Sequence, residues 1–268
     1  MNLYVSILPW RWLHVCWLAV LVSASVIACQ TVPITGRSQL MILSETEEVQ
    51  MGVQSYQQVL RKSKLSTDPA ANDLVKRVGT RIAAATGRGD YQWEFKVIEE
   101  QQANAFALPG GKVAVYTGIL PITRDDAGLV AVLAHEVSHA IARHGAERLS
   151  QDLLVQVGLA GTMAALSKGD PKTVQNVGAL LGAGAAVGLQ LPWNRAQESE
   201  ADHLGLIYMA KAGYDPHAAR DLWVRMAEAS KGGGRPPEFL STHPSEATRI
   251  KQIEAWLPEA MQYYRPAR

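Results

Sequence analysis

The sequence predicts a single α+β domain that is mostly helical and contains one small sheet. Apolar residues recur at three- and four-residue spacing over several stretches, which is typical of amphipathic helices. Between residues 91 and 117 short alternating runs appear instead, which are typical of strands. With 268 residues and 47% hydrophobic content, the chain can bury a substantial core.

The composition argues against some partners. The chain carries 26 Lys and Arg against 25 Asp and Glu, a formal net charge of +1. Because there is no basic excess and no charged tail, we do not expect it to bind nucleic acid. A specific site, rather than bulk charge, is expected to choose its partner.

Residues 1–28 have the pattern of a signal peptide. Arg11 precedes an apolar run from Leu13 to Ile27, which ends at Ala28-Cys29. This ending resembles a bacterial lipobox, which predicts cleavage after residue 28 and acylation of the Cys29 thiol. Gln30 resembles the sorting pattern for the outer membrane, so we expect a lipid anchor at the periplasmic face of the bacterial envelope. An uncleaved transmembrane anchor is the alternative.

Residues 29–43 are predicted to be a tether that begins to dock on the body, and residues 44–268 the folded domain. Ser44 and Glu47 form a capping box, which predicts a helix from Glu45 to about Arg61. Asp68-Pro69 starts a second helix, and Gly87 stops it.

Three short extended runs follow these helices. Residues 91–98 place Trp93, Phe95 and Val97 on one face of a strand. Residues 104–107 and 112–117 are two further runs, joined by a Pro-Gly-Gly turn. A small sheet is therefore expected immediately before the next helix.

The most informative stretch is residues 133–140, inside an apolar helical pattern that Asp125 is expected to cap. His135 and His139 are four positions apart, so on a helix both imidazoles can bind one metal ion. The Glu136 carboxylate lies beside them and can take a proton from water, whose pKa zinc lowers from about 15.7 to about 7. This pattern predicts hydrolysis, most simply of a peptide bond. The alternative is a core helix that carries these residues without a metal.

The remaining chain is predicted to be helical. Residues 149–191 are rich in Ala, Gly, Leu and Val and predict a helical hairpin, whose arms are shorter than the roughly 20 residues of a membrane span. Contact of this hairpin with a bilayer is an alternative. One more helix is expected to start at Asp215-Pro216, and the last from about Ser245 to Pro258.

Two histidines leave a catalytic zinc ion short of one protein ligand. Glu198 and Glu200 both offer a carboxylate downstream, and their spacing alone does not choose between them. Three other histidines are expected to be ordinary surface or core residues: His144, His203 and His217.

Three motifs carry a family resemblance: His135-Glu136-x-x-His139, Glu198-x-x-Ala201-Asp202 and Asn104-Ala105. Together they resemble the zinc endopeptidase family of the CAAX prenyl protease and the HtpX heat-shock protease, and within it the bacterial periplasmic lipoproteins. The resemblance implies a gluzincin-type metallopeptidase domain with one zinc ion per chain, in which Glu136 is the catalytic base. It also implies the zinc ligands, which are His135, His139 and Glu198.

The same resemblance implies further roles. Asp202 would accept a ring N–H of a ligating histidine and fix its tautomer. Asn104-Ala105 matches an edge strand to which substrate adds through its main chain, which implies broad specificity for unfolded polypeptide. His243 matches a position near the metal, where it would either stabilise the oxyanion or close zinc's open position as a latch.

We therefore expect a membrane-tethered zinc metalloendopeptidase that removes unfolded or misfolded cell-envelope proteins and contacts the membrane through lipid at Cys29. The alternative is a zinc-dependent periplasmic chaperone or assembly factor with little proteolytic activity. Glu136 separates the two hypotheses, because hydrolysis requires its carboxylate and binding does not.

Overall fold

The computed structural model describes residues 29–166, 191–231, 239 and 248–266. Helices dominate these residues and two small sheets accompany them, so the predicted α+β class is confirmed. Within the described ranges, no helix has both the length and the hydropathy to cross a membrane. Most of the residues predicted as a helical hairpin, 167–190, lie outside the described residues.

The bounds of the elements follow the chain in order. The strands are β1 (Cys29–Thr31), β2 (Ser38–Leu40), β3 (Glu94–Ile98), β4 (Ala105–Leu108) and β5 (Lys112–Tyr116). The helices are α2 (Glu45–Lys62), α3 (Pro69–Thr86), the 3-10 turn η1 (Thr117–Ile119), α4 (Leu120–Thr123), α5 (Asp126–Ile141), α6 (His144–Leu166), α8 (Leu191–Lys211), α9 (His217–Lys231) and α11 (Arg249–Tyr263).

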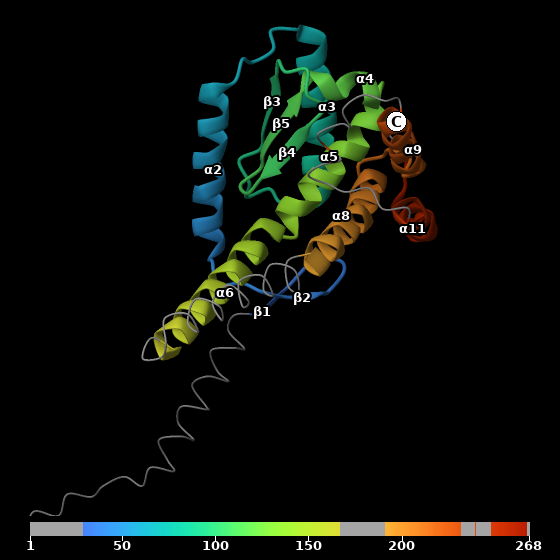
Figure 1. Cartoon of the computed structure of the whole chain (residues 1–268). Helices are drawn as coiled ribbons and strands as arrows, with labels where there is room; N and C mark the ends of the chain where they lie inside the picture. The colour runs from blue at the N-terminus through green and yellow to red at the C-terminus, as the bar shows by residue number, and fades with distance from the viewer. Residues whose placement is uncertain (1–28, 167–190, 232–238, 240–247, 267–268) are drawn as a thin grey trace, which may run out of the picture.

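The segment expected to be a tether is structured. β1 pairs with β2 as an antiparallel hairpin, and β2 packs beside α6 (Figure 1). Val32 and Met41 are buried, and the Ile42 N–H donates to Ser150 Oγ at 3.0 Å. We call residues 29–40 the N-terminal hairpin.

The two predicted helix starts are confirmed. The Ser44 side chain accepts the Glu47 N–H and the Glu47 carboxylate accepts the Ser44 N–H, which satisfies two backbone donors that α2 leaves unpaired. Asp68 caps α3 through the Ala70 N–H, and α3 ends at Gly87, whose φ of 72° is in the left-handed region.

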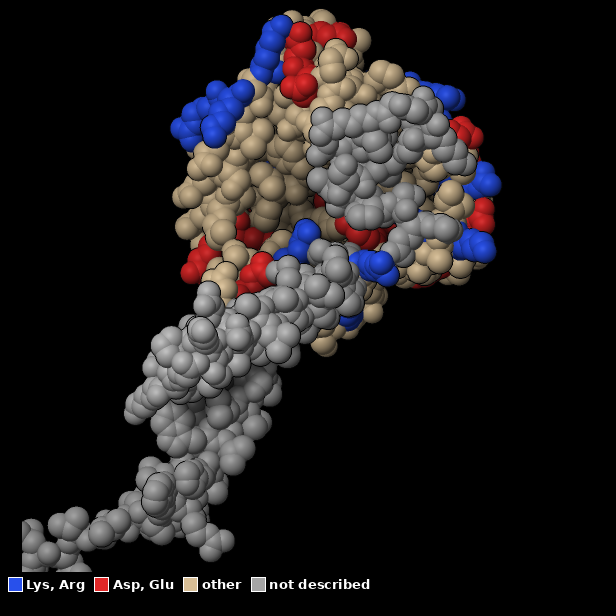
Figure 2. Space-filling view, in the orientation of Figure 1, with Lys and Arg blue, Asp and Glu red and all other residues tan. Residues whose placement is uncertain are grey.

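The main sheet has the order β3-β5-β4, with β3 parallel and β4 antiparallel to β5. α2 covers one face, where Tyr56 donates to the Val113 carbonyl at 3.0 Å, and α3 and α5 cover the other (Figure 1). β3 begins at Glu94 rather than Tyr91, because the Tyr91 N–H bonds to Arg88 in the turn after α3. On the side that carries β4, the surface is hollowed and mostly uncharged (Figure 2).

The last helix differs from its prediction. α11 begins at Arg249 and runs through Pro258 to Tyr263 instead of ending at the proline. Leu257 and Ala260 on either side of Pro258 are buried, so packing against the core holds a helix that proline alone would interrupt.

The predicted metal-binding helix is the centre of the core. Asp125 caps α5 by accepting the Gly128 N–H at 2.8 Å, and every residue from Gly128 to Ile141 is buried. α5 packs against α3, α8, α9 and β4. Because rigid elements surround it on several sides, α5 holds its side chains in fixed directions.

We expect Gly128→Ala to destabilise the protein by about 1–3 kcal/mol. A Cβ at this position would lie 2.0 Å from the Thr123 carbonyl oxygen, which is backbone and has little freedom to move. Denaturant unfolding measures the change. Gly145→Ala is the control, since a Cβ there meets nothing within 4 Å and alanine favours the helix by up to about 1 kcal/mol. Equal stability of the two variants would contradict the packing described.

Candidate metal centre

Three side chains from two helices converge at one point. α5 supplies His135 and His139, and α8 supplies Glu198. The two Nε2 atoms are 3.2 Å apart. The Glu198 carboxylate places Oε2 at 3.4 Å from Nε2 of His135 and Oε1 at 3.3 Å from Nε2 of His139. The structure thus brings together the predicted ligand set, and Glu198 rather than Glu200 completes it.

These distances fit a tetrahedral metal ion. Zn–N and Zn–O bonds of about 2.0–2.2 Å at the tetrahedral angle require neighbouring ligand atoms to lie about 3.3–3.5 Å apart. The two Nε2 atoms, 3.2 Å apart, are close to that requirement, and each has one of the two Glu198 oxygens at a similar distance, 3.4 Å for His135 and 3.3 Å for His139. Two imidazoles and one carboxylate are also ligand types that zinc accepts, so the residues present fit the ion.

The outer nitrogen of His135 has its own partner. Its Nδ1 lies 2.9 Å from Asp202 Oδ1, one helical turn after Glu198 on α8. Arg249, from the start of α11, holds the same carboxylate through Nη2 at 2.7 Å and stacks 3.4 Å from the Trp223 ring centroid. Asp202 therefore lies where it fixes the His135 tautomer, with Nε2 left for a metal.

The electrostatics of these buried groups follow from their neighbours. Burial disfavours the charged form of His135, but Asp202 and Glu198 outweigh it and raise the pKa to about 9. Burial holds the pKa of His139 well below its ordinary value. Burial also opposes ionisation of Asp202, yet Arg249 and His135 keep its pKa below its ordinary value. Asp202 is thus charged at neutral pH and remains an acceptor for His135.

His144 is a core residue, and it contacts a ligand, which the sequence did not indicate. Its Nδ1 lies 2.9 Å from Nδ1 of His139, and its Nε2 lies 2.9 Å from Glu200 Oε2. Arg143 has a left-handed backbone conformation, with a φ of 59°, which interrupts the helix between α5 and α6 and directs His144 toward His139. On an unbroken helix, residues five apart do not share a face, so spacing alone could not have found this contact.

Both members of the His144–Glu200 pair have shifted pKa values. Burial lowers the pKa of His144, which keeps the imidazole neutral. Burial opposes the charge of Glu200, but hydrogen bonds from His144, Thr35 and Arg37 lower its pKa to about 2. Glu200 is therefore a buried carboxylate with several donors, and it lies outside the cluster of His135, His139 and Glu198.

The other predicted residues are placed as follows. Glu136 is buried beside the two histidines on α5, and its role as catalytic base stays a prediction. Asn104 precedes the edge strand β4, which Ala105 begins. His243 lies outside the described residues. Cys29 begins β1, and its acylation stays a prediction.

The two remaining histidines, which we expected to be ordinary residues, lie away from the metal ligands. His203 stacks on Trp256 with ring centroids 4.9 Å apart and contacts Glu259. His217 is exposed at the start of α9 beside Asp215.

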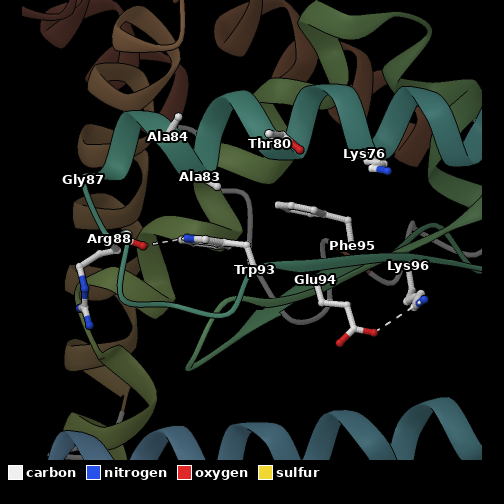
Figure 3. Close-up of a pocket in the computed structure, with 11 residues that line it drawn as sticks. Lys76, Thr80, Ala83, Ala84, Gly87, Arg88, Trp93, Glu94, Phe95 and Lys96 are labelled. Atoms are coloured by element: carbon white, nitrogen blue, oxygen red, sulfur yellow. Dashed lines mark hydrogen bonds and ion pairs between the residues drawn. The ribbon is translucent and has the colours of Figure 1, made fainter.

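A separate pocket of about 780 Å³ lies between α3 and β3 (Figure 3). Trp93 and Phe95 extend from the β3 side toward α3 with their rings 5° from parallel and 6.2 Å apart. The Trp93 indole N–H donates to the Arg88 carbonyl at 3.0 Å. The lining of this pocket includes none of the residues of the metal centre, so the two sites are distinct.

Comparison with known proteins finds relatives whose matches include every residue of the metal centre. Residues 69–257 match the model of peptidase family M48. The chain is 41% identical over 234 residues to the mitochondrial metalloendopeptidase OMA1 of Schizosaccharomyces pombe, covering 85% of this chain and 66% of the relative. It is 33% identical over 250 residues to the Saccharomyces cerevisiae protein of the same name, covering 87% and 70%.

The bacterial relatives match less closely. The beta-barrel assembly-enhancing protease of Escherichia coli is 28% identical over 229 residues, covering 83% of this chain and 46% of the relative. The expected location at the periplasmic face of the bacterial outer membrane is therefore wrong, because relatives at 41% and 33% identity are mitochondrial proteins. The lipobox-like ending that suggested it is a short pattern, whereas these matches extend over most of the chain.

We expect Asp202→Asn to weaken zinc binding about 10- to 100-fold, because the amide does not hold the His135 Nδ1–H as a carboxylate does. Competition with a chromophoric chelator measures the zinc dissociation constant. Glu259→Gln is the matched control, since it removes a carboxylate from the His203 pair, which does not include a metal ligand. Unchanged affinity in Asp202→Asn would count against this role.

Proposed function

This chain belongs to peptidase family M48, whose members use zinc, and from that premise we propose that it cleaves internal peptide bonds of unfolded or misfolded proteins. The observation that carries the proposal is the buried cluster of His135, His139 and Glu198 with Glu136 beside it. The chain spans 66% of the Schizosaccharomyces pombe relative, so the activity of that longer protein supports the proposal by analogy only.

The chemistry divides between the metal and the chain. His135, His139 and Glu198 would hold a zinc ion, which would supply the Lewis acid that polarises the scissile carbonyl and acidifies water. Glu136 follows His135 directly on α5 and is buried, with only 4% of the residue exposed. Its carboxylate takes the proton of the attacking water and delivers it to the leaving amine.

The edge strand β4 supports the choice of substrate. The Tyr116 N–H donates to the Asn104 carbonyl at 3.0 Å, so the backbone carbonyl of Asn104 faces β5 and the backbone N–H of the next residue, Ala105, faces the outer edge. On that edge the carbonyl of Ala103, just before β4, accepts the Phe239 N–H at 3.0 Å. The Ala105 N–H is occupied by its neighbour's side chain, because Asn104 Oδ1 accepts it at 2.9 Å. An extended substrate strand would replace that oxygen with its own carbonyl.

Main-chain recognition of this kind favours any extended segment. The hydrogen bonds come from backbone groups that all residues share, so the sequence of the substrate matters less than its being unfolded. The mostly uncharged hollow on the same side of the molecule is consistent with such a substrate (Figure 2). We propose protein quality control as the purpose of the activity.

The Escherichia coli relative is named a beta-barrel assembly-enhancing protease, and this name favours retaining the second hypothesis, a zinc-dependent assembly factor. A zinc-dependent assembly factor would use the same edge strand and bind unfolded chains without cutting them. Only hydrolysis requires the Glu136 carboxylate.

We expect Glu136→Gln to lower the rate of casein cleavage by about 10²- to 10⁴-fold, since the amide cannot accept the proton of water. Zinc content should be unchanged, because Glu136 is not a ligand. Gel analysis of casein digestion, beside metal analysis of the same samples, tests both statements. Glu99→Gln is the control, since the Glu99 side chain is exposed and its carboxylate forms a surface ion pair with Lys64.

Cleavage that persists in Glu136→Gln would overturn the assignment of the base. Zinc bound in the wild type without cleavage, together with binding of unfolded casein by both forms, would favour the assembly-factor hypothesis.

A further inference from the structure

We propose that the N-terminal hairpin positions the metal ligand His139 through a chain of three groups, Arg37, Glu200 and His144. This inference deepens the proposed function, because it rests on His139 being a zinc ligand. It assigns a role to three residues outside the ligand set, and it connects residues 29–40 to the metal centre.

The first step follows from the tautomer of His139. Its Nε2 faces His135 and Glu198, so this nitrogen must carry no hydrogen when it binds a metal. The single ring hydrogen is then on Nδ1, which lies 2.9 Å from Nδ1 of His144. His144 accepts it, so its own hydrogen is on Nε2 and is donated to Glu200 Oε2 at 2.9 Å. Glu200 thereby sets both tautomers.

The second step is the hold of the hairpin on Glu200. Thr35 Oγ1 donates to Glu200 Oε1, and Arg37 Nε donates to Glu200 Oε2 at 2.9 Å. The same guanidinium forms two bonds with Glu147, at 2.7 and 2.8 Å. One arginine therefore donates hydrogen bonds to two buried carboxylates and fixes the direction of Glu200.

The arrangement parallels that of the other histidine ligand. His135 has its tautomer fixed by Asp202 directly, and Arg249 holds Asp202. His139 has its tautomer fixed by Glu200 through one intervening histidine, and Arg37 holds Glu200. Both carboxylates lie on α8: Glu200 is two residues after Glu198, and Asp202 is four residues after it. An ion pair serving stability alone would need no link to His139.

The test measures zinc affinity rather than peptidase activity. We expect His144→Leu to weaken zinc binding about 10- to 100-fold, as loss of a ligand's hydrogen-bond partner does. His144→Gln should bind zinc within about threefold of the wild type, because one amide both accepts from His139 and donates to Glu200. Competition with a chelator gives the dissociation constant, and unfolding curves show that each variant is folded.

Arg37→Ala tests the contribution of the hairpin, and we expect roughly tenfold weaker zinc binding. Arg77→Ala is the matched control. Arg77 makes the same two-bond contact with Asp126, the first residue of α5, but has no link to His139. Its removal should leave zinc affinity unchanged.

Each outcome decides the question. Zinc affinity in Arg37→Ala and His144→Leu equal to the wild type, with only stability lowered, would overturn the inference and leave the proposed function intact. Weaker zinc binding in both variants, with no cleavage by the zinc-loaded wild type, would support the inference and refute the peptidase activity.

Discussion

The close packing of α8 against α5 is the constraint on which the metal centre depends, because the three ligands come from these two helices. Gly205 lies on α8 where the two helices come close together. A Cβ at that position would lie 3.3 Å from the backbone nitrogen of His135, closer than most side chains tolerate. Ala201 and Leu204 are fully buried on the same helix. The separation of the helix axes, set by small and apolar residues, therefore decides whether Glu198 reaches the two imidazoles.

A second constraint is the charge that the centre buries. Glu200 and Asp202 are almost completely removed from water, and a buried carboxylate is costly unless it is paired and hydrogen-bonded. Arg37 and Arg249 provide that pairing, one on each carboxylate. The charges that orient the histidines are thus stabilised by two arginines that are not themselves metal ligands.

Local patterns in the sequence were sufficient to predict the His135–His139 motif, the two capped helices α2 and α3, and the hairpin of β4 and β5. Each of these features depends on residues that are close together in the chain. The roles of His144, Arg37 and Arg249 could not be predicted in this way. His144 reaches His139 only because Arg143 adopts a left-handed conformation without being a glycine, and nothing in the residue types signals that break. The two arginines reach α8 through tertiary contacts, and residues 29–43 looked like a tether because their order comes from docking rather than from periodicity.

The meeting of Arg37 and Arg249 at neighbouring carboxylates of α8 bears on the order of folding. The Arg37–Glu200 contact joins residues 163 positions apart, and the Arg249–Asp202 contact joins residues 47 positions apart, so both form only when distant parts of the chain come together. A chain that has formed α5 and α8 but has not docked both arginines holds its histidines without their full support. Completion of the fold and completion of the support around the two histidines are therefore linked, because the same tertiary contacts provide both.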